Sequence, residues 1–148
     1  YSNNESQKQF YQLLRSKEFN EALIHGKLAI SKEPLNLKVL FGLYVCYSKL
    51  GQPKVGDLYL FQYYGLLSAI FNSGDGKSIS TAFVVLSVDD EYEFIASIHH
   101  RVKKQELVLG STDLMYLEKT KSKPKKSPNY RKMYFNIEIP LIYMRNNK

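Results

Sequence analysis

The sequence is poor in cysteine and in long apolar runs, and each shortage excludes a class of protein. The single cysteine, Cys46, excludes an internal disulfide, and its place in the apolar helical pattern VLFGLYVCYSKL predicts a small buried side chain. No apolar stretch approaches the roughly eighteen uninterrupted residues of a transmembrane helix. The chain begins at Tyr1, so we expect a mature or trimmed chain from which any signal peptide has been removed.

A nucleotide-binding loop is also missing, although NSGDGKSIS (72–80) contains the Gly-Lys-Ser with which such a loop ends. That loop needs an earlier glycine to open the turn whose amides surround the phosphates, and Phe71 stands at that position. A helical run precedes the stretch and a β-branched run follows it, the reverse of the required context. We therefore expect Gly74 and Gly76 to end a helix, with an anion site built from exposed amides as the less favoured alternative. No cofactor is expected.

The first half of the chain has apolar residues at helical spacing. The pattern predicts two short helices before Pro34, a third from the N-cap Asn36 to Leu50, and a fourth that begins near Pro53. The segment FNEALIHGKLAISKEP resembles the second helix of a tetratricopeptide repeat, and LKVLFGLYVCYSKLGQP resembles the first helix of another. The resemblance implies two helical hairpins.

The second half changes to the period of β-strands near Ser80. TAFVVLSV (81–88) is typical of a central strand buried on both faces, and Asp90 with Glu93 has the spacing of an N-cap and N3 pair. QELVLGSTDLMYLEK (105–119) predicts a strand broken or bulged at Gly110, and MYFNIEIP predicts a half-buried strand that Pro140 ends.

The predicted fold class is therefore α+β in a single domain, residues 1–148. Tetratricopeptide-like helical hairpins (1–73) are expected to pack on a small, mostly antiparallel sheet (74–148).

The segments SGDGKS, DEYEFI and YFNIEIP carry a second resemblance, which spans nearly the whole chain. With the helical start, they are similar to a domain-of-unknown-function family of small exported proteins from gut bacteria of the Bacteroidetes type. The resemblance implies an extracytoplasmic location: periplasmic, secreted or lipid-anchored. It implies no activity and no functional residues.

Catalytic and metal-binding residues are not predicted. Besides His25, the histidines are the neighbours His99 and His100, whose side chains diverge on a helix or a strand and so cannot readily hold one ion. A cluster of acids could offer paired carboxylates for acid–base work, but we favour a helix start, where acidic residues meet the positive end of the helix dipole. The cluster comprises Asp89, Asp90, Glu91 and Glu93.

Charge is the most uneven feature of the sequence. The segment KTKSKPKKSPNYRK, from Lys119 to Lys132, holds seven of the 21 basic residues and no acid, so the rest of the chain has 14 bases and 14 acids. Prolines and serines mark the segment as a long hairpin loop between two strands. Its candidate polyanion-binding residues are Lys119, Lys121, Lys123, Lys125, Lys126, Arg131 and Lys132. We nevertheless favour a solvated loop that keeps the protein soluble, because charged runs commonly do no more than that.

Tyrosines concentrate on the third and fourth predicted helices, and most should belong to the core or its boundary. Those that could line a recognition groove are Tyr44, Tyr47, Tyr59 and Tyr63. The favoured function is thus a non-catalytic module that binds a peptide or protein partner through its helices. The alternative is a weak binder of nucleic acid, anionic lipid or acidic glycan through the basic loop, without specific nucleic-acid recognition. An enzyme is the least favoured class.

Overall fold

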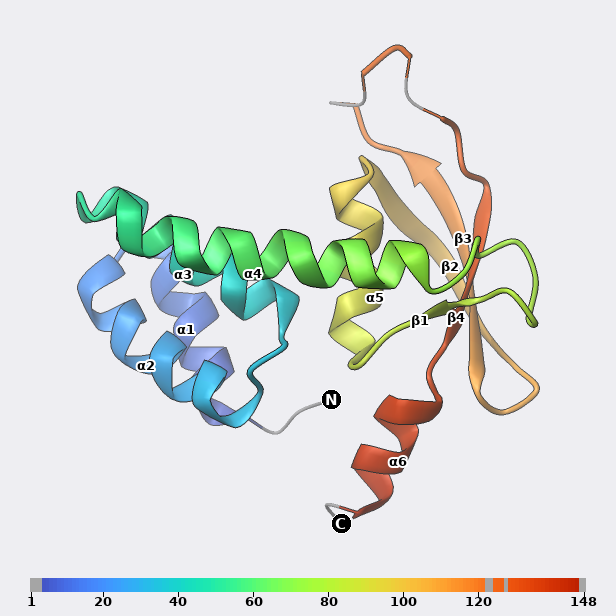
Figure 1. The fold of residues 1–148 in the computed structure, drawn as a ribbon, viewed down its shortest axis with the longest axis horizontal. Helices are drawn as coiled ribbons and strands as arrows, with labels where there is room; N and C mark the ends of the chain where they lie inside the picture. Colours follow the sequence, from blue (N-terminus) through green and yellow to red (C-terminus); the bar gives the residue numbers. More distant parts are fainter. Residues whose placement is uncertain (1–3, 122–123, 127, 147–148) are drawn as a thin grey trace. The chain divides into compact units, whose positions relative to one another are not determined.

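The computed structural model describes residues 4–121, 124–126 and 128–146 (Figure 1). The described residues form six helices and a four-stranded sheet, which confirms the α+β class. In chain order the elements are α1 (Glu5–Arg15), α2 (Phe19–Lys32), α3 (Leu37–Lys49), α4 (Pro53–Asn72), β1 (Phe83–Val84), α5 (Val88–Ser97), β2 (His100–Val108), β3 (Thr112–Lys119), β4 (Lys132–Asn136) and α6 (Glu138–Asn146).

The chain divides into two compact units, which we call the helical unit (Tyr1–Leu67) and the sheet unit (Ser68–Lys148). Helix α4 begins in the first and ends in the second. The boundary inferred from the sequence, between residues 73 and 74, falls later, just after α4 has ended. The 20 residues of α4 are not apolar enough to cross a membrane, nor is any other described helix.

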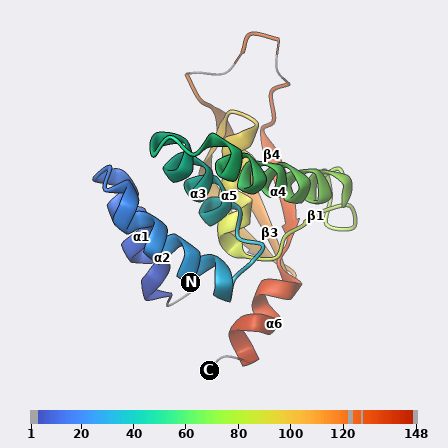
Figure 2. The same cartoon turned by 60° about the vertical axis from the view of Figure 1, so that its left-hand side comes forward.

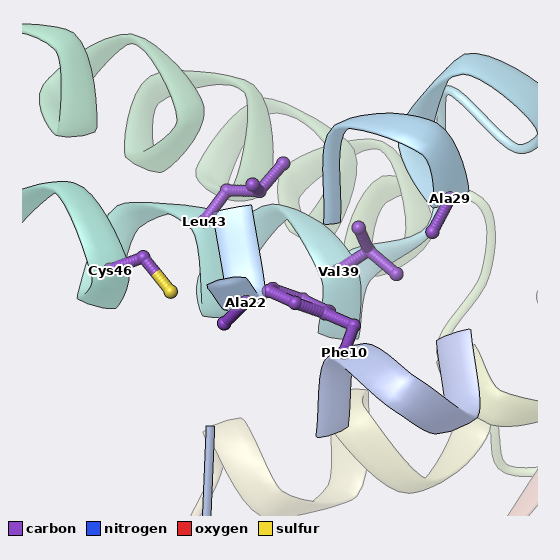
Figure 3. Close-up of a cluster of buried hydrophobic side chains, with 6 residues drawn as sticks. All are labelled: Phe10, Ala22, Ala29, Val39, Leu43 and Cys46. Carbon is purple, nitrogen blue, oxygen red and sulfur yellow. The ribbon is translucent and has the colours of Figure 1, made fainter. Parts of the chain in front are cut away.

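The helical unit is built around Phe10 of α1, whose side chain is fully buried. A Cβ atom added to Gly26 or Gly42 would lie only 2.7 Å from the Phe10 ring, so α2 and α3 can approach that ring only because both positions are glycine. Figure 3 shows the ring among buried side chains from α2 and α3. They are Ala22, Ala29, Val39, Leu43 and Cys46.

The predicted helix boundaries hold in this unit. The Asn36 Oδ1 atom accepts a hydrogen bond of 3.1 Å from the Val39 amide, so Asn36 caps α3 as expected. Pro53 is the first residue of α4, where its fixed φ suits a helix start. Gly51 lies between these helices with a positive φ of 75°, a conformation that glycine adopts without strain.

The sheet has the strand order β1-β4-β3-β2. Strand β3 pairs antiparallel with both β2 and β4, whereas β1 pairs parallel with β4, so the sheet is mixed. Helix α5 lies beside β2 in both views (Figures 1 and 2).

The prediction of a central strand over residues 81–88 is wrong. Only Phe83 and Val84 form a strand, and it lies at the edge of the sheet. The Ser73 hydroxyl oxygen accepts a hydrogen bond of 2.8 Å from the Val84 amide, so this amide does not pair with another strand. Ser87 is the N-cap of α5, which ends the extended segment. The apolar residues are nevertheless buried, because Phe83 packs 4.8 Å from Phe94 and 5.8 Å from Phe135 between ring centroids.

Helix α5 begins three residues earlier than predicted. Ser87 is the N-cap, and its hydroxyl accepts the Asp90 amide while the Asp90 carboxylate accepts the Ser87 amide at 3.1 Å. Asp90 therefore takes the N3 role in the capping box, where the sequence interpretation had placed Glu93.

Residues 105–119 form parts of two strands, not one bulged strand. Leu109 and Gly110 have φ values of 50° and 75° and make the turn of the β2–β3 hairpin, while the register irregularity lies between Val102 and Lys104. The last strand ends at Asn136, and Pro140 lies in the first turn of α6, where a missing backbone N–H breaks no helical bond. The strand predicted to reach Ile139 was therefore too long.

Candidate functional site

The acids at the start of α5 are not all surface residues. Asp90 and Glu91 are fully buried, and Asp113 of β3 is 4% exposed. Asp90 is used in the capping box of α5. Glu91 lies against Asp113, so two carboxyl groups from different elements meet within the sheet unit.

A short hydrogen-bonded series leads from this pair to the surface. The Tyr92 hydroxyl donates to Gln105 Oε1 at 2.6 Å, and Gln105 Nε2 donates to Asp113 Oδ2 at 2.7 Å. Neither oxygen of an ionised Glu91 finds a donor among the described residues. Protonation resolves this, because a protonated Glu91 donates its own hydrogen to the Asp113 carboxylate.

The electrostatics agree with that assignment. Burial raises the pKa of Glu91 to about 9, and the negative charges of Asp113 and Asp90 add to the effect. Burial also raises the pKa of Asp113, while hydrogen bonds from Gln105 and Glu91 lower it. At neutral pH Glu91 therefore holds the proton and Asp113 holds the charge.

The carboxyl pair is closed to substrates as it stands. A general acid must come within hydrogen-bond distance of its substrate, and the Glu91 side chain has no exposed surface. A surface cavity of about 330 Å³ lies elsewhere in the sheet unit. It is lined by Ser111, Glu138, Leu141, Ile142 and Arg145. The geometry of the pair thus supports a structural role and adds nothing in favour of an enzyme.

The three histidines do not form a common site. The buried His100 has its Nδ1 atom 2.8 Å from the Ile98 carbonyl oxygen, and its Nε2 atom accepts the Tyr130 amide at 3.1 Å. His99 is exposed, and His25 lies on α2. Among the described residues no three His, Cys, Asp or Glu side chains form a group suited to a metal ion. Cys46 is buried, and burial raises the pKa of its thiol to about 11.

The loop at residues 72–80, which resembles a phosphate-binding loop, uses its backbone amides for hydrogen bonds within the loop. The Asp75 and Gly76 amides donate to the Thr81 carbonyl oxygen at 3.0 and 2.9 Å, and the Lys77 amide donates to Asp75 Oδ1 at 2.9 Å. The Thr81 hydroxyl donates to the same Asp75 oxygen at 2.6 Å, which lowers the pKa of Asp75. A side chain at Gly76 would collide with the Phe83 ring. These contacts make a compact turn.

The four candidate groove tyrosines lie where α3 and α4 meet. Tyr47 and Tyr63 are buried, and Tyr44 and Tyr59 are partly buried. Tyr47 stacks on Tyr59 with ring centroids 5.6 Å apart and planes 10° apart. Gly56 allows this approach, since a Cβ atom there would lie 3.1 Å from the Tyr44 carbonyl oxygen. Most of the tyrosine surface is therefore used to pack the two helices together.

The opposite side of α4 carries exposed apolar residues that sequence reasoning did not single out. We call them the α4 face: Leu58, Phe61 and Tyr64, which are 65%, 80% and 59% exposed. They recur every three residues, a spacing that could have been read from the sequence. Apolar residues occupy both sides of α4, however, so the sequence did not show which side would be covered.

The basic residues lie where the sequence placed them, in the connection between β3 and β4. Lys123 lies outside the described residues. The remaining six are exposed, and we call them the basic rim: Lys119, Lys121, Lys125, Lys126, Arg131 and Lys132.

Comparison with known proteins places the chain in a family. A model of the family described as Domain of unknown function (DUF4919) matches residues 1–145. The chain belongs to this family. No curated protein and no solved structure matches it significantly. The family therefore assigns neither an activity nor a functional residue.

Proposed function

We propose that this DUF4919 protein is an interaction module whose helical unit binds a protein partner through the α4 face. The observation that carries the proposal is the exposure of Phe61, 80%, between Leu58 and Tyr64, which are also largely exposed. Full burial of one such apolar side chain is worth about 1.5–3 kcal/mol. A cluster of them on one helix is therefore a surface that gains free energy when it is covered.

The spacing of the α4 face fits recognition of another apolar segment. Residues three apart on a helix are neighbours, so Leu58 and Tyr64 lie on either side of Phe61 and the three side chains share one side of α4. Such apolar helix sides are used when helices dock in apolar grooves.

Gly65 adds a second feature to this surface. It lies inside α4 next to Tyr64, and a Cβ atom there would meet nothing within 4 Å. Glycine in a helix interior costs about 1 kcal/mol relative to alanine. Packing within the described structure does not require it, whereas a partner whose backbone approaches closely would benefit from the missing side chain.

The resemblances found in the sequence support the repeat-like architecture and an extracytoplasmic location. The helical pairs α1–α2 and α3–α4 resemble tetratricopeptide repeats, and small residues such as Gly26 and Gly42 give the close helix packing that such repeats need. The proposed location is extracytoplasmic, as in the exported proteins that the sequence resembles. Cell fractionation of the producing organism tests the location, and recovery with cytoplasmic markers would contradict it.

The interaction is tested by site-specific photo-crosslinking in the producing organism. Benzoylphenylalanine replaces Phe61 in one variant and the exposed Lys49 of α3 in a matched control. We expect a discrete protein adduct from position 61 that the control lacks. Adding Leu58→Ser should weaken the adduct while changing the melting temperature little, because Leu58 is 65% exposed. The same adducts from both positions, or none from position 61, would refute the proposal.

A further inference from the structure

The basic rim carries positive charge that no acid among the described residues neutralises through an ion pair. The two ion pairs found among the described residues are Arg101–Glu118, at 2.7 Å, and Lys104–Glu106, at 2.5 Å, and neither includes a rim residue. Glu118 is the acid adjacent to Lys119 in β3, and it is already engaged by Arg101. The whole net charge of +7 thus belongs to one connection, and the six cations of the rim are exposed.

The base of this connection is held by hydrogen bonds. The Leu117 amide donates to the Arg131 carbonyl oxygen at 2.8 Å, and the Thr120 amide donates to the His99 carbonyl oxygen at 3.0 Å. The Tyr130 amide donates to His100 Nε2 at 3.1 Å. Lys119, Lys121, Arg131 and Lys132 are therefore part of, or next to, backbone that the sheet unit holds in place. In Figure 1 the coloured part of the connection, residues 124–126, lies past the end of β3.

The chemistry of the rim indicates the kind of partner. Five of its six cations are lysines, which act as point charges and lack the planar fork with which arginine reads a single phosphate or carboxylate. The one aromatic residue between Lys119 and Lys132 is Tyr130, and its ring is partly buried, edge-on to the His100 ring at 5.5 Å. The segment therefore offers no open ring on which a nucleic-acid base could stack.

Clustered lysines on a protruding connection suit a flat, dense array of anionic headgroups, where each basic residue adds a similar attraction. We propose that the basic rim docks the sheet unit on an anionic phospholipid membrane. The contact is electrostatic and peripheral. It uses a different surface and a different partner from the α4 face, so either interaction can exist without the other.

The test is sedimentation of the full chain with vesicles of phosphatidylcholine, with or without phosphatidylglycerol. The rim variant carries Lys119→Gln, Lys121→Gln, Lys125→Gln and Lys126→Gln. The control variant carries Lys8→Gln, Lys32→Gln, Lys49→Gln and Lys54→Gln, which are exposed lysines of the helical unit. Both variants lose the same net charge, and exposed charges contribute little to folding. Thermal melts of both variants are the control for folding, and we expect both to melt near the wild-type temperature.

Wild type should bind vesicles that contain phosphatidylglycerol, fail to bind pure phosphatidylcholine, and dissociate as salt is raised. Each lysine near such a surface contributes about 1 kcal/mol, or about fivefold in partitioning, so the rim variant should lose at least about a hundredfold. The control should stay within about tenfold of wild type. Equal losses in both variants would show a diffuse effect of net charge and overturn the proposal. Absence of binding to anionic vesicles, or tighter rim-dependent binding to duplex DNA or heparin at the same salt, would overturn it as well.

Discussion

Replacing Glu91 by glutamine should stabilise the protein, although the substitution changes a fully buried residue. In the unfolded chain this carboxyl has its ordinary pKa of 4.5, whereas in the folded chain its pKa is about 9. Folding at pH 7 therefore has to bind a proton that the unfolded chain lacks, at a cost of about 3 kcal/mol. Glutamine removes this cost and keeps the hydrogen bond, because its amide N–H can donate to the Asp113 carboxylate as protonated Glu91 does.

The sign of the pH dependence follows from the raised pKa. Between pH 4.5 and about 9 the folded state binds one more proton at Glu91 than the unfolded state, so wild-type stability falls as the pH rises through this range. The slope approaches about 1.4 kcal/mol per pH unit. Below pH 4.5 both states are protonated at this residue, and the variant should lose its advantage.

The assay is chemical denaturation of wild type and Glu91→Gln at several pH values from 5 to 9. At pH 7 we expect the variant to gain about 2–3 kcal/mol, and its melting temperature to rise by about 10 °C if the sheet unit melts as a domain of that size. Glu21→Gln, a change at an exposed acid of α2, is the control and should have little effect. A variant less stable than wild type at pH 7, together with a flat wild-type profile, would refute the protonated pair.

Three further predictions concern other parts of the chain. Gly26→Ala should destabilise the helical unit by about 1–3 kcal/mol in urea denaturation, because its Cβ would lie 2.7 Å from the Phe10 ring; an unchanged midpoint would contradict that packing. Leu109→Asn should raise stability by up to about 1 kcal/mol, since Leu109 is 81% exposed with a φ of 50° that asparagine tolerates better; a loss would indicate an apolar contact at this turn. ATP with magnesium should leave the melting temperature unchanged, because the amides of residues 75–77 already donate within the loop; a rise that disappears in Lys77→Ala would show phosphate binding.

Much of the helical unit could be predicted from the sequence. Its signals are local, because a cap or a stop acts within one turn of the helix it bounds. Asn36 and Pro53 therefore marked the starts of α3 and α4 correctly. In the sheet unit two pairs of residues had the spacing of a helix cap. Asp90 and Glu93 had the spacing of a cap, but Ser87 and Asp90 have the same spacing, and the sequence did not decide between them.

The strand predicted over residues 81–88 is wrong because an apolar run shows that residues are buried, and does not show that they pair with another strand. Burial and strand pairing are separate requirements, and residues around Phe83 meet the first through contacts with other aromatic rings. Only two of these residues pair with β4. Pro140 likewise does not end a strand, since a proline in the first turn of a helix breaks no bond.

The amino-acid sequence is enough to predict the α+β class, the helices up to Asn72 and the position of the basic loop, because these depend on periodicity, local caps and the distribution of charge along the chain. The side of α4 that is covered depends on the folded chain, in which Tyr59 stacks on Tyr47 of α3 and Phe61 stays exposed. Only the fold brings Glu91 next to Asp113, which are 22 positions apart in the chain. A pKa depends on burial and on neighbouring charges, and both are properties of the folded chain.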